Sequence, residues 1–409
     1  MGPGRAVRNA AHTFLRLAAL GSMALALAAC QRVPGTARDA KPVFYPLPPD
    51  PPRIQYLTSI NTAWDVVPER RGLAGFLLGP REPGARNRAL VKPYGIAVWN
   101  GRIYVCDQRG GDVEVFDLIK GDHHSLSGAS GLMKSPTNLC VDPEGYKFIV
   151  ESMRGVIHAF DPQDAHVASF KLKEGRPGGI ASVGKELFVT DVTGDRILVL
   201  DRATGNVLRT FGSKGKEPGQ FIMPNAIAAD AAGDLYISDQ MNFRLQKLDR
   251  EGKPLLVTGK AGDAYGTFAR PRGVAVGPDG TIYVVESVFE IVQMFNQEGK
   301  VLMGFGNYHG APGFLELPAG VAVDTSCLKH FARYVDPRFE PQYLVFVASQ
   351  VGAARIGVYA FGHLKQGAET PATTIPKAAP RPPEASQPAP KPPEGPQPAP
   401  TPEPPSSRP

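Results

Sequence analysis

The sequence predicts an all-β protein, a six-bladed β-propeller made of four-stranded blades. Three observations predict it: a similar phrase returns along the chain, a proline opens each copy, and each copy holds four short apolar runs between tight turns. The copies begin 43, 41, 47, 47 and 47 residues apart, at Pro93, Pro136, Pro177, Pro224, Pro271 and Pro318. A period of about 40–50 residues with four strands per unit is typical of a propeller blade.

One stretch, Phe221–Leu256, shows the complete unit. It contains the apolar runs AIAA and LYISD, the alternating run FRLQKL and a fourth run after DREGK. Gly233 and Gly252 occupy the turns between runs, where a positive φ favours glycine. We expect four antiparallel strands joined by tight turns in this stretch and in the other copies.

The first strands are compatible with a crowded axis, because they pair a branched apolar residue with a small one. They read PYGIAV, PTNLCV, PGGIAS, PNAIAA, PRGVAV and PAGVAV, so the fourth residue after the proline is alanine in five copies and Cys140 in the other. The second strands usually end in a carboxylate, at Asp107, Glu151, Asp191, Asp239 and Glu286, with Ser349 in the sixth copy. These acids could form a cation site, but a residue repeated in nearly every blade fits a local turn better.

Three copies also share a lead-in, which reads FGSKGKEPGQF, TGKAGDAYGTF and FGNYHGAPGFL. Together with the six phrases, this resembles the NHL-repeat family over about Arg53–Gly362. The resemblance implies a propeller, mostly of six blades. It implies no particular activity, since propellers host unrelated functions.

The ring needs a strand from the N-terminal side to close. Arg53–Ile60 alternates like a strand, whereas the last blade ends at Val358–Phe361 without a clear fourth strand. We therefore expect Arg53–Ile60 to complete the sixth blade, because closure removes open sheet edges. That blade also has an insertion, Asp324–Gln342, with helical spacing over Cys327–Tyr334; it could dock a partner, act as a lid, or merely pack on the rim.

The N-terminus predicts export. Arg5 and Arg8 precede an apolar run that ends in Leu-Ala-Ala-Cys, with Cys30 last. Residues 1–29 resemble a bacterial lipoprotein signal peptide, which implies cleavage before Cys30 and acyl chains on it. The alternative is an ordinary signal peptide with a chance cysteine. The resemblance implies a lipid-anchored protein of the bacterial cell envelope, and Gln31 favours the outer membrane, facing the periplasm or the surface.

Composition divides the rest of the chain. Residues 30–52 form a tether whose end, Pro42–Pro52, should be polyproline-like. Residues 53–364 form the propeller, in which the glycine-rich connection Asn61–Lys92 crosses one face. Residues 365–409 are rich in proline and lack the apolar content for a core, so we expect a disordered spacer or a ligand for a partner domain.

Charge and cysteine content exclude several classes of function. The net charge of +6 falls to about +3 without the three leader arginines, which is no nucleic-acid-binding excess. Cys106, Cys140 and Cys327 remain after lipidation and look like small core residues. The sequence contains no CxxCH or CxxC motif, so we expect no cofactor and no metal.

The variable positions predict a binding face around the channel mouth. They are the residues after each opening proline and the loops after the second strands. In those loops, Met241, Phe243, Val288 and Phe289 would form an apolar patch that favours a protein partner, unless some turn inward. The candidate binding residues are Tyr94, Thr137, Asn225, Arg272, Arg109, Arg154, Met241 and Phe289.

These features favour a non-catalytic interaction or scaffold module in a cell-envelope assembly. The resemblance suggests a setting beside a multihaem cytochrome system, with this chain as an accessory. The alternative is a hydrolase or lyase at the channel mouth around Tyr94, Asn225 and Arg272, as in related propeller enzymes such as the streptogramin lyases, and a small-molecule ligand stays open. No residue is assigned a catalytic role, because no histidine falls at a mouth position.

Overall fold

The computed structural model describes residues 42–66 and 89–370. The predicted signal peptide, Cys30, most of the 61–92 connection and the proline-rich tail beyond Thr370 lie outside the described residues. No described helix is long and apolar enough to cross a membrane.

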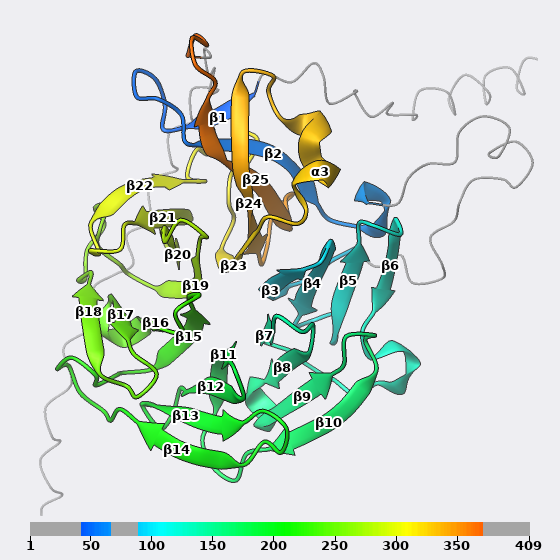
Figure 1. The fold of residues 1–409 in the computed structure, drawn as a ribbon, viewed down its shortest axis with the longest axis vertical. Coiled ribbons are helices and arrows are strands. Elements are labelled where there is room, and N and C mark those ends of the chain that lie inside the picture. Colours follow the sequence, from blue (N-terminus) through cyan, green and yellow to red (C-terminus); the bar gives the residue numbers. More distant parts are fainter. Residues whose placement is uncertain (1–41, 67–88, 371–409) are drawn as a thin grey trace, which may run out of the picture.

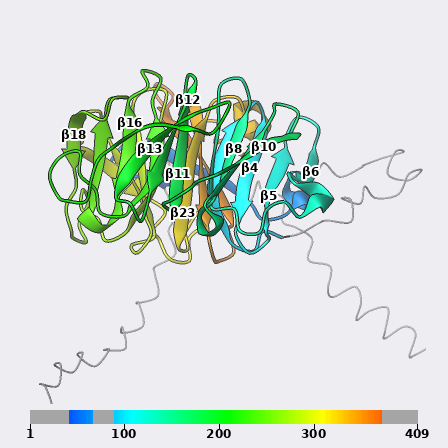
Figure 2. The same cartoon turned by 90° about the horizontal axis from the view of Figure 1, so that it is seen from below.

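Six antiparallel sheets stand in a ring around a central axis, which confirms the predicted propeller (Figure 1). Seen from the side, the strands run across the thickness of a disc (Figure 2). The first three blades are β3 (Pro93–Trp99), β4 (Arg102–Asp107), β5 (Asp112–Asp117) and β6 (Asp122–Ser125); β7 (Asn138–Val141), β8 (Lys147–Glu151), β9 (Val156–Phe160) and β10 (His166–Lys171); and β11 (Pro177–Val183), β12 (Glu186–Asp191), β13 (Arg196–Asp201) and β14 (Val207–Phe211).

The fourth and fifth blades repeat this order, with the first strand innermost. They consist of β15 (Pro224–Ala229), β16 (Leu235–Asp239), β17 (Arg244–Leu248) and β18 (Pro254–Thr258), and of β19 (Pro271–Val276), β20 (Ile282–Glu286), β21 (Ile291–Phe295) and β22 (Val301–Phe305). Between the blades, apolar side chains of neighbouring sheets pack together, as Phe148 and Ile157 of blade two do with Leu187 of blade three.

The sixth blade joins the two ends of the described chain. Its strands are β23 (Pro318–Asp324), β24 (Phe339–Ser349), β25 (Ile356–Leu364) and, from the N-terminal side, β2 (Ile54–Ile60). β2 pairs antiparallel with β25, from Ile54 opposite Phe361 to Ile60 opposite Ile356. The predicted closure by the N-terminal strand is therefore confirmed.

A fifth strand, β1 (Val43–Tyr45), lies outside β2 and corrects the expected polyproline-like tether. Its three side chains are buried. Phe44 packs on Phe339 with ring centroids 5.6 Å apart, and Tyr45 stacks on Tyr308 at 5.4 Å. Burial of these apolar side chains outweighs the influence of the prolines that follow, which begin only after the strand ends.

Glycines let the inner strands approach each other at the axis. A Cβ on Gly320 would lie 2.2 Å from the carbonyl oxygen of Tyr94, and one on Gly273 would lie 2.7 Å from that of Ala319. Gly95 and Gly179 meet the next inner strand in the same way. The tightest position is thus the second residue after the opening proline, two residues before the alanines that the sequence pattern singles out.

The insertion of the sixth blade contains the expected helical turns, α3 (Leu328–Phe331) and η5 (Ala332–Tyr334). It is shorter than predicted, because Phe339–Gln342 extend β24 and pair with the end of β25. Phe331 is buried with its ring centroid 5.8 Å from that of Phe346, and Gln55 donates a hydrogen bond to the carbonyl of Tyr334 at 3.0 Å. These contacts agree with packing on the rim.

Candidate binding face at the channel mouth

Strand register places the opening prolines and the closing residues at the same end of each blade. Pro93 lies opposite Asp107, Pro224 opposite Asp239, and Pro318 opposite Ser349. The loops after the second strands therefore lie on the same face as the residues that follow the prolines. We call this the mouth face, and the other end of the blades the opposite face.

The five closing acids are buried and accept hydrogen bonds from the loops that precede the opening prolines. Asp107 accepts from the backbone N–H groups of Val91 and Lys92 at 2.7 and 2.8 Å, and Glu286 accepts from Ala269 and Arg270 at 2.9 Å each. Glu151, Asp191 and Asp239 make equivalent bonds. The contacts are those of a local turn, and the described residues contain no group of three or more potential metal ligands.

Glu151 also anchors a polar chain that leads away from the mouth. Its Oε2 lies 3.0 Å from Nε2 of His158, whose Nδ1 lies 2.8 Å from Oγ of Ser169. Burial lowers the pKa of His158, while the bond to Glu151 opposes that shift. Because His158 and Ser169 stand on β9 and β10, this chain ties the closing acid to the outer strand of blade two.

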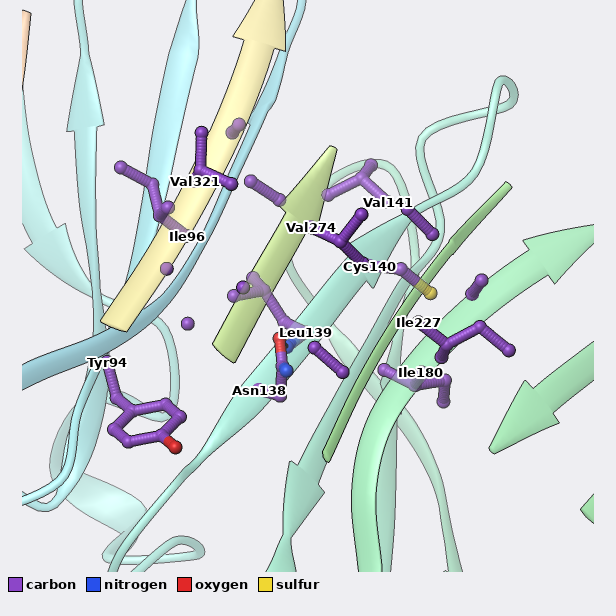
Figure 3. A pocket seen from close by; sticks show the side chains of 18 of the residues that line it. Tyr94, Ile96, Asn138, Leu139, Cys140, Val141, Ile180, Ile227, Val274 and Val321 are labelled. Carbon is purple, nitrogen blue, oxygen red and sulfur yellow. Dashed lines mark hydrogen bonds between the residues drawn. The ribbon is translucent and has the colours of Figure 1, made fainter. Parts of the chain in front are cut away.

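A narrow channel of about 230 Å³ runs between the inner strands (Figure 3). Tyr94, Asn225 and Ala319 line it, whereas in blade two Asn138 lines it and Thr137 does not. Thr137 instead donates its hydroxyl proton to the carbonyl of Val150 at 2.9 Å. The remaining wall is mostly apolar, with Ile96, Leu139, Val274 and Val321, and the described lining includes no charged side chain.

Arg272 reaches across the mouth from blade five to blade one. Its Cζ lies 5.2 Å from the ring centroid of Tyr94, and blade six, with the small residue Ala319 at the same position, lies between these two blades. Its Nε and Nη1 atoms are buried without a hydrogen-bond partner among the described residues. The sequence could place Arg272 near the mouth, but not this reach or these unpaired donors.

Large apolar side chains recur on the mouth face two residues after the closing position. Met153, Met241, Val288 and Val351 occupy this place in blades two, four, five and six, with 43–80% of their surface exposed. Phe243 and Phe289 are half-buried, unlike Met241 and Val288. Phe243 turns inward because it follows η4 (Gln240–Asn242) and packs against the core between blades four and five.

The mouth face also carries basic residues that net charge alone does not reveal. Arg109 is exposed, whereas Arg154 donates to Glu151 at 2.8 Å and to the carbonyl of Leu132 at 3.1 Å. Further cations stand in the loops just before the opening prolines. These are Lys92, Lys134, Arg176 and Arg270, all at least partly exposed.

Comparisons with known proteins identify the fold. No family model matches the chain. A structural genomics protein of unknown function from Bacteroides thetaiotaomicron superposes with a TM-score of 0.50 at 15% identity, covering 75% of each chain. A streptogramin B lyase gives 0.48 at 16% identity, covering 66% of this chain and 94% of the lyase, and virginiamycin B lyase from Staphylococcus aureus gives 0.46 at 14%, covering 66% and 95%. At these identities the likeness extends to the six-bladed propeller alone.

Proposed function

We propose that this chain is a bacterial lipoprotein of the NHL-repeat type, whose propeller serves as a non-catalytic docking platform for another cell-envelope protein. The observation that carries the proposal is the set of exposed apolar side chains on the mouth face. We call Met153, Met241, Val288 and Val351 the apolar collar.

The apolar collar supports a protein partner because its members occupy one structural position in four blades. Blades four, five and six are consecutive, so Met241, Val288 and Val351 follow one another around the mouth. Single exposed apolar residues are ordinary on protein surfaces, but a repeated set around one opening is typical of an interface. Methionine adds an adaptable contact surface.

The channel favours docking over chemistry. General acid–base catalysis needs a titratable side chain within reach of the substrate, and the described lining offers only Tyr94 and Cys140. Burial raises the pKa of the Cys140 thiol far above its ordinary value, which keeps it protonated and unreactive. The lyase alternative therefore lacks a supporting group in the channel.

A short tether would hold the platform close to the lipid bilayer. Cys30 precedes Pro42 by 12 residues, and an extended chain spans at most about 3.6 Å per residue, or roughly 45 Å in total. With β1 packed into blade six, the ring would stand within that distance of the acylated cysteine. The outer membrane is the proposed site, and a place beside a multihaem cytochrome system fits a scaffold of this kind.

A cross-linking pull-down from native membranes tests the docking role. The full chain is compared with a variant that replaces the apolar collar by serine and with a control that replaces Leu208, Leu255 and Leu302, which are equally exposed on outer strands. We expect one defined envelope protein to be recovered by the full chain and the control and lost by the collar variant. Equal recovery by all three proteins would contradict a contact through the mouth face.

A truncated chain that ends at Leu364 tests whether the partner binds the propeller or the tail. Retention of the partner by this shorter chain supports the mouth face as the docking surface. Loss of the partner from the shorter chain, together with retention by the collar variant, would move the contact to the proline-rich tail and overturn the proposed platform.

A further inference from the structure

Arg272 holds hydrogen-bond donors that its surroundings leave unused. A guanidinium is charged at every physiological pH and has five N–H donors. Cζ of Arg272 lies over the ring of Tyr94, 5.2 Å from its centroid, yet Nε and Nη1 find no acceptor among the described residues. Buried donors without acceptors are costly, so an acceptor that enters the mouth and reaches them through a small shift of the side chain would relieve that cost.

The contact with Tyr94 also determines which acceptor fits. A cation–π contact occupies one face of the guanidinium and leaves its edge free. An N–H group at that edge can donate a charge-assisted hydrogen bond to a carboxylate oxygen. Asn225, which lines the same channel, adds an amide donor within the mouth.

The charge around Arg272 selects for a negative ligand. Lys92, Arg176 and Arg270 precede opening prolines, and Arg109 and Lys134 are exposed in neighbouring loops. Acids also lie on this face, and they are engaged in contacts: the closing acids accept backbone N–H bonds, Glu174 pairs with Arg196 at 2.6 Å, and Glu290 accepts from the N–H of Leu317. The exposed cations before the opening prolines are therefore the groups that would attract acidic side chains to the mouth.

The opposite face contains an acidic cavity. A cavity of about 640 Å³ there is lined by Asp230, Asp234, Asp279 and Asp324, with Lys247 paired to the first two. An acidic partner segment would be repelled from this end of the disc and drawn to the other. The two faces thus give a partner a preferred orientation.

The apolar channel restricts how far such a ligand can enter. Below Tyr94 the wall consists of side chains such as Ile96, Leu139 and Val321, which can accept an aliphatic stem but cannot solvate a charge. A glutamate or aspartate side chain would leave its carboxylate at the mouth, against Arg272. A segment with several acids would then extend over the surrounding cations.

We propose that Arg272, backed by Tyr94 and beside Asn225, binds a carboxylate in an acidic segment of the partner protein. This rests on the proposed docking function and adds the chemistry of the partner. The apolar collar supplies contact area, and Arg272 supplies the charge recognition at the centre.

Fluorescence anisotropy of the purified full chain with labelled deca-glutamate tests this inference, with labelled deca-glutamine as the neutral probe. We expect binding of deca-glutamate that weakens with salt, no comparable binding of deca-glutamine, and about tenfold weaker binding by Arg272→Gln. Arg272→Lys should recover only part of the affinity, since lysine keeps the charge but lacks the planar fork.

The control is Arg333→Gln in the insertion of blade six. Arg333 also lies over a tyrosine ring, with Cζ 4.7 Å from the centroid of Tyr334, but it does not belong to the mouth face. We expect this variant to bind deca-glutamate like the unmodified chain. Equal binding by Arg272→Gln and the unmodified chain, or equal weakening by both variants, would overturn the inference. Competition by free glutamate at a concentration similar to that of the peptide's glutamates would point to a small-molecule site instead.

The two proposals can fail separately. If the pull-down loses the partner with the collar variant but not with Arg272→Gln, the docking function stands and the carboxylate anchor is wrong. If neither variant loses the partner, the docking function itself fails. Unchanged circular dichroism and denaturation midpoints would show that the variants are folded.

Discussion

Lys147 is a fully buried cation that links two blades. Its Nζ lies 2.5 Å from Oδ1 of Asp164 and 2.6 Å from the carbonyl oxygen of Asp161. The same ammonium lies 5.4 Å from the ring of Tyr104 and 5.7 Å from that of Trp99, both in blade one. A buried charge is tolerated only with this degree of pairing, so the cluster holds blades one and two in a fixed relation.

The decrease in folding stability at acidic pH should depend on Asp164. Burial by itself would raise the pKa of this carboxyl, but hydrogen bonds from His124 and Lys147 outweigh it and hold the pKa at about 2, below the ordinary 3.8. Since the folded state binds the proton less well than the unfolded chain, the stabilisation is complete above pH 4 and is lost as the pH falls towards 2. We expect Asp164→Asn to cost about 2 kcal/mol at pH 7.

Urea denaturation midpoints at pH 7 and pH 2.5 measure this effect. The deficit of Asp164→Asn relative to the unmodified chain should shrink at the lower pH, because most of the stabilisation from the ionised carboxylate is lost between pH 4 and pH 2. Asp122→Asn, an exposed acid in β6, serves as the control and should change little at either pH. A deficit that is the same at both pH values would show that packing, and not ionisation, is lost.

At the level of elements, the repeated blades are the best predicted, because six aligned copies show the same pattern of strands and turns. The closing strand is predicted from the alternation in Arg53–Ile60 and from the missing fourth strand of the last blade. β1 is missed because prolines follow it and no other blade has a fifth strand. The end of the insertion is misplaced for a similar reason, since Phe339 begins a strand longer than those of other blades.

Some features of the candidate site could be predicted from the sequence, and others could not. Register places Tyr94 and Asn225 in the channel and the exposed Met241 on the mouth face. The reach of Arg272 could not be predicted, because it depends on the position of the Tyr94 ring two blades further around the ring. The inward turn of Phe243 likewise depends on a local φ of 55° that the sequence pattern does not specify.

Strand β1 should contribute strongly to the stability of the ring. Phe44 is 1% exposed and packs among Phe339 and other core side chains of the sixth blade. Truncation of a buried phenylalanine leaves a cavity and typically costs about 3–5 kcal/mol. We expect Phe44→Ala to lower the denaturation midpoint markedly, and Leu302→Ala, on an exposed position of β22, to lower it little. A cost below about 1 kcal/mol for Phe44→Ala would mean that β1 detaches from β2 without affecting the core.

At the scale of the whole molecule, the propeller is a disc with two unlike faces. One face has the apolar collar, the unpaired Arg272 and several cations, and the other has the acidic cavity. The described part of the chain begins at the rim, where β1 lies on the outer edge of the sixth blade (Figure 1). A lipid anchor before β1 would therefore hold the disc by its rim. The point of attachment would cover neither face.

The proposed anchor makes a prediction for the intact protein. In the native host, the unmodified chain should fractionate with membranes and incorporate radiolabelled palmitate, since several acyl chains give stable attachment. Cys30→Ser should abolish the label and release the chain into the soluble fraction. Its denaturation midpoint should stay unchanged, because position 30 precedes every strand that the structure describes. If the unmodified chain takes up no label, or if Cys30→Ser still sediments with membranes, the platform is held by something other than a lipid, and the distance limit set by the tether no longer applies.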